Sequence, residues 1–200
     1  MPRAGPDPKS RNTYSLATVR LDIVVPEKTD ADGLYSLIGG SDRREVCANL
    51  IWDGPDSIVD TLSWIERCQS EPYRDWGFHW VIRDRAGDIT GTEGSAIGAI
   101  GTRPRGEPGR ADVGYWLGRP YWGQEIMSEA LESVLDLGFA ELDYYKIEAD
   151  VFTENTRGRR LVEKAGLTHE GTIRNAYRKY GEWVDDAIYG ILYEEWSLPR

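Results

Sequence analysis

The most regular pattern of apolar positions in the chain lies between residues 112 and 139. The alternating segment Asp112–Leu117 predicts a strand, and a loop that begins at Gly118 follows it. Beyond this loop, apolar residues recur at the spacing of one helical face: Ile126, Met127, Ala130, Leu131, Val134 and Leu135. Gly138 is the expected end of the helix, because glycine readily adopts the left-handed conformation of a C-terminal cap. The segment therefore predicts a strand, a glycine-containing loop and a helix.

Similar patterns predict the other elements. Helices are expected at Ala31–Ile38, Arg43–Leu50, Ser57–Cys68 and Asn155–Ala165. Strands are expected at Val19–Val25, Phe78–Arg83, Ala96–Gly101, Lys146–Phe152, Thr168–Ala176 and Trp183–Trp196. Because helices and strands alternate irregularly, the pattern favours an α+β class with a mostly antiparallel sheet and helices on its faces.

Length and composition limit the class of protein further. The chain has 200 residues, which suits one domain, and we expect that domain to span residues 14–200. Residues 1–13 are polar and hold three prolines, which favours a flexible N-terminal tail. No stretch approaches the roughly 20 apolar residues of a membrane helix, and the N-terminus lacks the apolar centre of a signal peptide. Two cysteines are too few for a disulfide scaffold, so we expect a cytoplasmic protein without membrane partners.

The formal net charge of −10 bears on the choice of partner. Proteins that bind nucleic acid usually carry a basic face, so this charge argues against a nucleic-acid partner. An acidic surface attracts cationic ligands such as amines, and it also serves solubility alone. The charge leaves these two interpretations open.

The loop and helix start between Trp122 and Ser128 form a candidate phosphate site. The first N–H groups of a helix have no acceptor within the helix, and the helix dipole adds partial positive charge there. Phosphate groups commonly bind at such positions. A strand, glycine loop and helix also occur for purely structural reasons, so this pattern alone does not decide the function.

Two sequence blocks carry a resemblance to a known family. The first comprises Asp112–Leu117, Tyr121–Gln124 and Ser128–Ala130, and the second runs from Val151 to Gly171. In order and spacing they resemble the GNAT acetyltransferases, specifically the RimJ/RimL-like branch. The resemblance implies a mixed, mostly antiparallel sheet of seven strands that splays open between its fourth and fifth strands, with helices on both faces.

The same resemblance implies where acetyl-CoA, the expected cosubstrate, would bind. Its thioester would lie between the splayed strands beside backbone N–H groups around Trp116 and Leu117, and its pyrophosphate would bind the loop and the helix start. Asn155 would lie near the CoA arm, although an asparagine at a helix start is also a natural cap. The full expected set is Trp116, Leu117, Trp122, Gly123, Gln124, Glu125, Ile126, Met127, Ser128, Asn155 and Arg160, and no metal is expected.

Two residues depart from the family pattern. Glu125 stands where the resembled loop has a second glycine, and a carboxylate about 6 Å from a phosphate would weaken binding about a hundredfold. The carboxylate could instead point into solvent, or Arg119, Arg159 or Arg160 could offset its charge. Gly158 stands where the family has a serine near the thiol, so that position offers no hydroxyl.

Transfer of an acyl group to an amine needs a base and a group that assists the departing thiolate. The resemblance makes Asp112 the candidate base, since a carboxylate often precedes the Gly-Tyr-Trp of this strand. An edge carboxylate that is merely solvated is the alternative. Tyr115, Tyr121 or a water could assist the thiolate, or it could leave unassisted; Tyr115 is the residue that we assign to this role. His79 and His169 rank below Asp112, because the first lies in an apolar strand and the second is expected to be exposed.

The function implied is transfer of an acetyl group from acetyl-CoA to a primary amine by direct attack. The acceptor classes left open are a protein N-terminus, an amino acid, a polyamine and an amino-sugar. Residues expected to contact the acceptor are Trp52, Tyr177, Tyr180 and Trp183. The alternatives are a binding or regulatory protein of the same fold, or a transferase with another acyl donor; the oligomeric state stays open, with a homodimer as one option.

Overall fold

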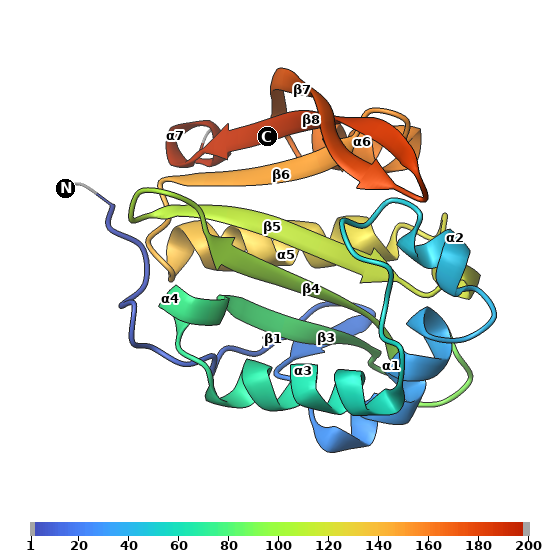
Figure 1. Cartoon of the computed structure of the whole chain (residues 1–200). Coiled ribbons are helices and arrows are strands. Elements are labelled where there is room, and N and C mark those ends of the chain that lie inside the picture. Colours follow the sequence, from blue (N-terminus) through green and yellow to red (C-terminus); the bar gives the residue numbers. More distant parts are fainter. Residues whose placement is uncertain (1–2, 198–200) are drawn as a thin grey trace.

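The computed structural model describes residues 3–197 and contains an eight-stranded sheet. The strands lie in the order β1-β2-β3-β4-β5-β6-β8-β7 (Figure 1). All neighbouring strands are antiparallel except β5 and β6, which are parallel. The predicted α+β class with a mixed, mostly antiparallel sheet is therefore confirmed.

The elements have the following bounds. The strands are β1 (Leu16–Ala17), β2 (Leu21–Val24), β3 (Phe78–Asp84), β4 (Ala96–Pro104), β5 (Arg110–Leu117), β6 (Lys146–Phe152), β7 (Thr168–Lys179) and β8 (Glu182–Leu192). The helices are α1 (Ala31–Ile38), α2 (Arg43–Cys47), α3 (Ile58–Ser70), α4 (Tyr73–Trp76), α5 (Ile126–Ala140), α6 (Thr156–Lys164) and α7 (Tyr193–Trp196), with 3₁₀ turns at Lys28–Asp30 and Arg119–Tyr121.

The two faces of the sheet carry different helices. Helices α1 and α3 pack on one face, over β3 and β4, which we call the α1 face. Helix α5 packs on the other face, across β2, β4 and β5, and α6 lies beside it against β6 (Figure 1). We call this the α5 face. The apolar stripe of α5 that the sequence predicted is buried there, because Ile126, Ala130, Leu131 and Val134 are at most 1% exposed.

Gly138 does not end α5, which continues to Ala140. Instead it lies inside the helix where the helix approaches its neighbours closely. A Cβ atom at this position would come within 2.7 Å of the Ile147 side chain and 2.9 Å of the Tyr144 ring. Glycine is therefore needed here for close packing, and the left-handed residue of the following turn is Asp143, with φ of 54°.

The ends of the chain also differ from the expectation. The last strand stops at Leu192, and Tyr193–Trp196 forms one helical turn rather than more strand. The two-residue strand β1 pairs with β2 and brings the sheet from the seven expected strands to eight.

The N-terminal segment is attached to the domain, where a flexible tail was expected. The Arg3 guanidinium lies 3.3 Å from the centre of the Tyr193 ring and donates a hydrogen bond to the Phe139 carbonyl. Asn12 is 6% exposed, and its side chain donates to the carbonyl of His79. Polar residues suggested solvation, but here they supply donors to backbone carbonyls of the core.

Strands β5 and β6 pair over three positions only. Their register runs from Arg110 opposite Lys146 to Asp112 opposite Glu148, and the strands then diverge (Figure 1). We call the diverging segments, Val113–Leu117 and Ala149–Phe152, the fork. This is the splay that was expected between the fourth and fifth strands, which become β5 and β6 once the short β1 is counted.

Candidate active site

The β4–β5 ladder fixes which backbone groups of β5 face the fork. Gly118 N donates to Ile97 O, and Arg105 N donates to Arg110 O. Alternate residues of an antiparallel strand point to the same neighbour, so Trp116 directs its N–H toward β4. The N–H groups of Tyr115 and Leu117 point the other way, into the fork, where no described strand pairs with them. We expected a free N–H group at Trp116. The register corrects this expectation, because the free N–H group beside that of Leu117 belongs to Tyr115.

A second group of free amides lies where the loop enters α5. Trp122 N donates to Arg119 O and Glu129 N donates to Glu125 O. Between them, none of the N–H groups of residues 123–128 has an acceptor in the described part of the chain. Gly123 and Glu125 both have left-handed backbones, with φ of 74° and 58°, which turn this loop into the helix. The loop thus presents a row of donors suited to phosphate oxygens.

Within the described chain, the Glu125 carboxylate bonds to two side chains and to none of these amides. It accepts hydrogen bonds from the Ser128 hydroxyl at 2.9 Å and from the Lys164 ammonium. The Lys164 contact is the main reason that the pKa of Glu125 lies below its usual value. The offsetting charge is thus Lys164 of α6, which sequence reasoning missed, because only the fold brings the end of α6 to this loop.

The three arginines considered for that role lie elsewhere or make no such contact. Arg119 pairs with Glu45 at 2.6 Å, and Arg159 donates to the Tyr189 hydroxyl at 3.0 Å. Arg160 is exposed, and no partner is seen for it within residues 3–197.

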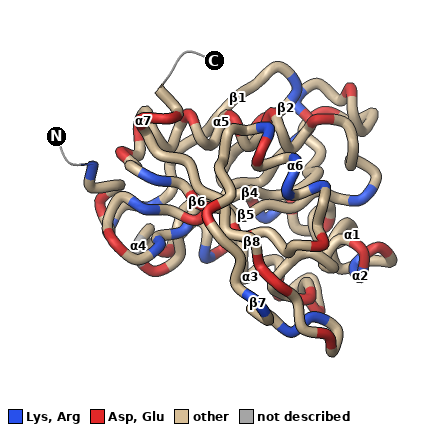
Figure 2. The backbone as a smooth tube through the Cα atoms, turned by 90° about the horizontal axis from the view of Figure 1, so that it is seen from above, with Lys and Arg blue, Asp and Glu red and all other residues tan. Residues whose placement is uncertain are grey.

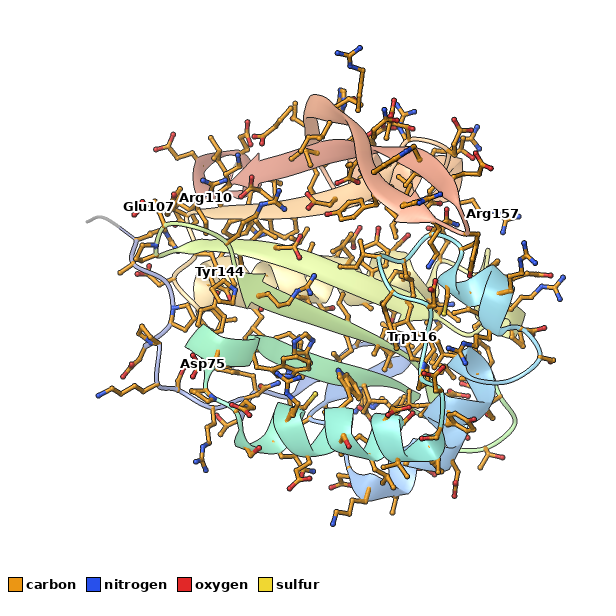
Figure 3. The ribbon with its side chains drawn as sticks, viewed as in Figure 1. Asp75, Glu107, Arg110, Trp116, Tyr144 and Arg157 are labelled. Carbon is orange, nitrogen blue, oxygen red and sulfur yellow. The ribbon has the colours of Figure 1, made fainter. Side chains whose placement is uncertain are left out.

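Basic residues of α6 flank the phosphate loop. Arg157, Arg160 and Lys164 are spaced three and four apart, so they share one side of the helix. The first lies over the Trp122 ring at 5.7 Å and the last contacts Glu125. Arg160 lies between these two contacts in the helix and is free to meet a phosphate. Figure 3 shows Arg157 at the end of the molecule toward which the fork opens.

Asn155 caps α6, and Gly158 makes room for it. The Asn155 side-chain oxygen Oδ1 accepts a hydrogen bond from Gly158 N at 3.0 Å. A Cβ at Gly158 would come within 2.5 Å of the Asn155 amide nitrogen, so a serine there would displace the cap. The capping interpretation of Asn155 is confirmed, and glycine at 158 follows from it.

Asp112 lies at the closed end of the fork and is held by two arginines. Its side chain is 15% exposed and accepts from Arg103 at 2.9 Å and from Arg105 at 3.3 Å. Burial raises the pKa of Asp112, and the neighbouring Arg103 opposes that rise. It is therefore not simply solvated, because an arginine engages each of its two oxygens.

Two further carboxylates, missed from the sequence, share the α1 face with Asp112. Asp150 of β6 accepts from Arg105 at 2.7 Å. Asp186 of β8, opposite Phe152, is 1% exposed, and its Oδ1 has no hydrogen-bond partner in the described chain. Burial, and then Asp150, raise the pKa of Asp186 to about 6. The sequence gives little signal for it, because β8 carries Glu182 and Asp185 as well.

Tyr115 and the histidines do not join this cluster. Tyr115 packs into the core on the α5 face, and burial raises its pKa, so the hydroxyl stays protonated. His79 is stacked against Trp64 and Trp76, and burial lowers its pKa to about 4. His169 is exposed and contacts Thr172.

Of the four expected acceptor residues, the structure brings three toward the α1 face. The Lys179 ammonium donates to Trp52 O at 2.8 Å, which joins the β7–β8 hairpin to the segment after α2. The Tyr180 hydroxyl donates to Arg44 O in α2, and the Tyr177 ring lies 5.7 Å from that of Phe152. Trp183 pairs with Arg178, the neighbour of Tyr177 in β7. Because successive residues of a strand point to opposite faces, the Trp183 side chain points away from the other three.

The parallel strands β5 and β6 splay apart, and two groups of free amides lie beside them. This arrangement is typical of a class of folds that bind acyl-CoA. Residues 20–168 match the sequence profile described as "Acetyltransferase (GNAT) domain". The chain therefore belongs to the GNAT family of acetyl-CoA-dependent N-acetyltransferases, as its sequence motifs predicted.

Relatives and solved structures agree with this family. The probable N-acetyltransferase YjcK of Bacillus subtilis (strain 168) is 35% identical over 130 residues, which are 64% of this chain and 68% of YjcK. The uncharacterized N-acetyltransferase p20 of Bacillus licheniformis is 36% identical over 91 residues, 46% of this chain, and the match spans about half (51%) of p20. The structure of Mycobacterium smegmatis RimJ in complex with CoA-disulfide superposes with a TM-score of 0.74 at 22% identity, covering 90% of this chain and 84% of RimJ.

Within the described residues, no helix is long and apolar enough to cross a membrane, and no group of three or more His, Cys, Asp or Glu side chains is arranged to hold a metal. Basic and acidic positions are interspersed over the backbone (Figure 2). They do not gather into the single basic face that nucleic-acid binding favours.

Proposed function

We propose that the chain transfers the acetyl group of acetyl-CoA to a primary amine by direct attack. The acceptor is an amine of a protein N-terminus, an amino acid, a polyamine or an amino-sugar. The observation that carries this proposal is the presence of two groups of free amides, Tyr115 and Leu117 in the fork and residues 123–128 at the start of α5.

Each group of amides has a task suited to its place. The N–H groups of Tyr115 and Leu117 are held rigidly by the β4–β5 ladder and can donate to the thioester carbonyl oxygen as negative charge develops on it. The amides of the loop, with Arg157 and Arg160 beside them, suit the phosphates of the CoA moiety. Acetyl-CoA supplies the activated acyl group, and the chain supplies the orientation.

Direct attack is favoured because no thiol is placed to accept the acetyl group. Cys47, the last residue of α2, is fully buried, and Cys68 is 2% exposed within α3. Burial raises the pKa of both thiols, and a protonated thiol is a poor nucleophile.

The alternative of a protein that has lost turnover rested on Glu125 and Gly158. Lys164 pairs with the carboxylate of Glu125 and offsets its charge, and Gly158 accommodates the cap of α6. Neither residue therefore argues for lost binding, and we favour turnover over a purely regulatory role.

The test combines calorimetry with an acceptor screen. Titration with acetyl-CoA should give a saturable heat, and a panel of primary amines should contain members that release free thiol faster than water does. If acetyl-CoA gives neither heat nor a thermal shift at millimolar concentration, the proposal fails. Heat without thiol release from any amine would favour the non-catalytic alternative, and a stronger response to a longer acyl-CoA would change the donor.

A further inference from the structure

The α1 face of the fork holds three carboxylates, which differ in their partners. Asp112 is bound by Arg103 and Arg105, and Asp150 is bound by Arg105. The Asp186 oxygen Oδ1 receives no hydrogen bond from any described residue, although the residue is 1% exposed. We refer to these three residues as the carboxylate cluster.

A buried carboxylate without a partner is costly and calls for an explanation. The Asp186 oxygen Oδ1 is fully covered, and Asp150 and Asp112 impose like charge on the same group. Arg105 is the one cation acting on Asp186, and its guanidinium is already engaged by the other two carboxylates. The site therefore lacks a hydrogen-bond donor with positive charge.

The surroundings of Asp186 show what kind of cation would fit. Tyr177 lies on the same face and stacks against Phe152, which is the partner of Asp186 in the β6–β8 ladder. An aromatic ring beside carboxylates is a favourable environment for an organic ammonium group. On the floor of the same face, Gly114 of β5 is exposed in the middle of the sheet, so solvent reaches the fork from this side.

We propose that Asp186 binds the ammonium group of the acceptor and removes its proton, and that Asp112 only positions Arg105. The acceptor class is a primary alkylamine or arylalkylamine whose chain lies along Tyr177 and Phe152. This inference rests on the proposed acetyl transfer and assigns the base within it.

The proton and electron balance is as follows. The ammonium gives one proton to the Asp186 carboxylate, which later releases it to solvent. The nitrogen lone pair forms the N–C bond to the acetyl carbonyl carbon, and the C–S bond breaks with its electron pair on sulfur. The remaining surplus proton of the nitrogen passes to that sulfur, so the products are the amide, free CoA thiol and one proton.

The pH dependence follows from the groups that face Asp186. They are Asp150 on β6, Asp112 on β5, Arg105 before β5 and Tyr177 on β7. The pKa of Asp186, raised to about 6 by burial, lies close to neutral pH, which suits a general base. The value of kcat/KM should therefore rise with pH through about 6 in the wild type.

The test compares Asp186→Asn, Asp112→Asn and the control Asp185→Asn, using the fastest amine of the acceptor screen. Asp185 is the adjacent residue on the other face of β8, where it accepts from Asn175 N. We expect Asp186→Asn to lower kcat/KM by about 100-fold and to remove the rise near pH 6. Asp112→Asn should keep that rise, and Asp185→Asn should match the wild type.

A binding measurement gives a second readout that does not depend on turnover. Butylammonium titrated into CoA-saturated protein should bind Asp186→Asn at least tenfold more weakly than the wild type or Asp185→Asn. Full activity, an unchanged pH profile or unchanged butylammonium affinity in a folded Asp186→Asn would overturn this inference alone. A wild type without CoA binding or thiol release would overturn the proposed function, and this inference with it.

Discussion

At the scale of single residues, the site depends on how individual charges are matched. Asp112 was the candidate base because of its place in a motif, and the structure shows it held by Arg103 and Arg105. Asp186 has no motif around it, yet its buried Oδ1 has no hydrogen-bond partner among the described residues. A motif identifies a position in a strand, whereas the availability of a side chain depends on neighbours that only the folded chain supplies.

Asp186 should make the stability of the protein depend on pH. Its folded pKa of about 6 lies above the ordinary value of 3.8, so the folded state favours the protonated form. This stabilising effect is complete below about pH 4 and is lost as the pH rises through 6. Asp186→Asn should not show this loss. The free energy of unfolding of the variant minus that of the wild type should therefore increase by about 2–3 kcal/mol between pH 4 and 7.

Urea unfolding of both proteins at four pH values measures this difference. Other titrating groups cancel in the comparison because they are common to both chains. A difference that stays constant from pH 4 to 7 would show that Asp186 finds a partner that the structure lacks.

Glu125 and Lys164 make a second charge prediction. Glu125→Gln keeps the shape of the side chain and releases the Lys164 ammonium toward the phosphate loop. CoA should then bind about 3- to 10-fold more tightly, with the gain lost at high salt. Lys164→Met should have the opposite effect, because it leaves the carboxylate of Glu125 beside the loop without a cation.

Calorimetry with CoA at two salt concentrations checks both variants. The double variant Glu125→Gln/Lys164→Met is the matched control, since it removes both charges and should restore nearly the wild-type affinity. Equal affinity of all four proteins would mean that the CoA phosphates bind elsewhere.

At the scale of elements, strands and helices follow the sequence pattern closely, and their ends follow tertiary contacts. The spans Ala31–Ile38 and Lys146–Phe152 agree with the structure residue for residue. Helix α5 continues beyond Gly138, which was expected to end it. Glycine occurs there because the helix packs too closely against Ile147 and Tyr144 to leave room for a Cβ atom. Periodicity reports which face is buried, but it does not report how near the next element lies.

Gly138→Ala tests this reading of α5. Alanine favours a helix over glycine by about 1 kcal/mol, so propensity alone predicts stabilisation. The contacts at 2.7 and 2.9 Å predict instead a loss of about 1–3 kcal/mol from overpacking. The control is Gly171→Ala, whose added Cβ would meet nothing within 4 Å. Thermal unfolding would contradict the account if Gly138→Ala were as stable as that control.

A buried lysine, Lys179, joins the β7–β8 hairpin to the segment after α2. Lys179 is 8% exposed and donates to Trp52 O and to Asp53 at 2.6 Å. Lys179→Met should lower stability by about 1–3 kcal/mol, because those acceptors lose their donor. The KM for the amine should rise more than the KM for acetyl-CoA, since the hairpin borders the α1 face and not the phosphate loop. Equal changes in the two KM values would show that the hairpin does not contribute to acceptor binding.

At the scale of the whole molecule, the family and the class of sheet could be predicted from the sequence, and the place of the CoA site stays a prediction. What could not be predicted depends on segments far apart in the chain. Lys164 meets Glu125, Arg105 joins Asp112 to Asp150, and the N-terminal segment meets the core only after folding. Likewise, the register with β4 determines that the N–H group of Trp116 is bonded and those of Tyr115 and Leu117 are free. The sequence of β5 alone does not contain this information.

The central claim is that free backbone amides of β5 and of the α5 start bind acetyl-CoA. Amide hydrogen exchange, followed residue by residue by NMR with and without CoA, tests it most directly. We predict that CoA slows exchange at Tyr115, Leu117 and Ile126–Ser128, and leaves Trp116 unchanged because β4 already protects it. If CoA bound and these amides exchanged as before, or Trp116 alone responded, the account of this site would be wrong.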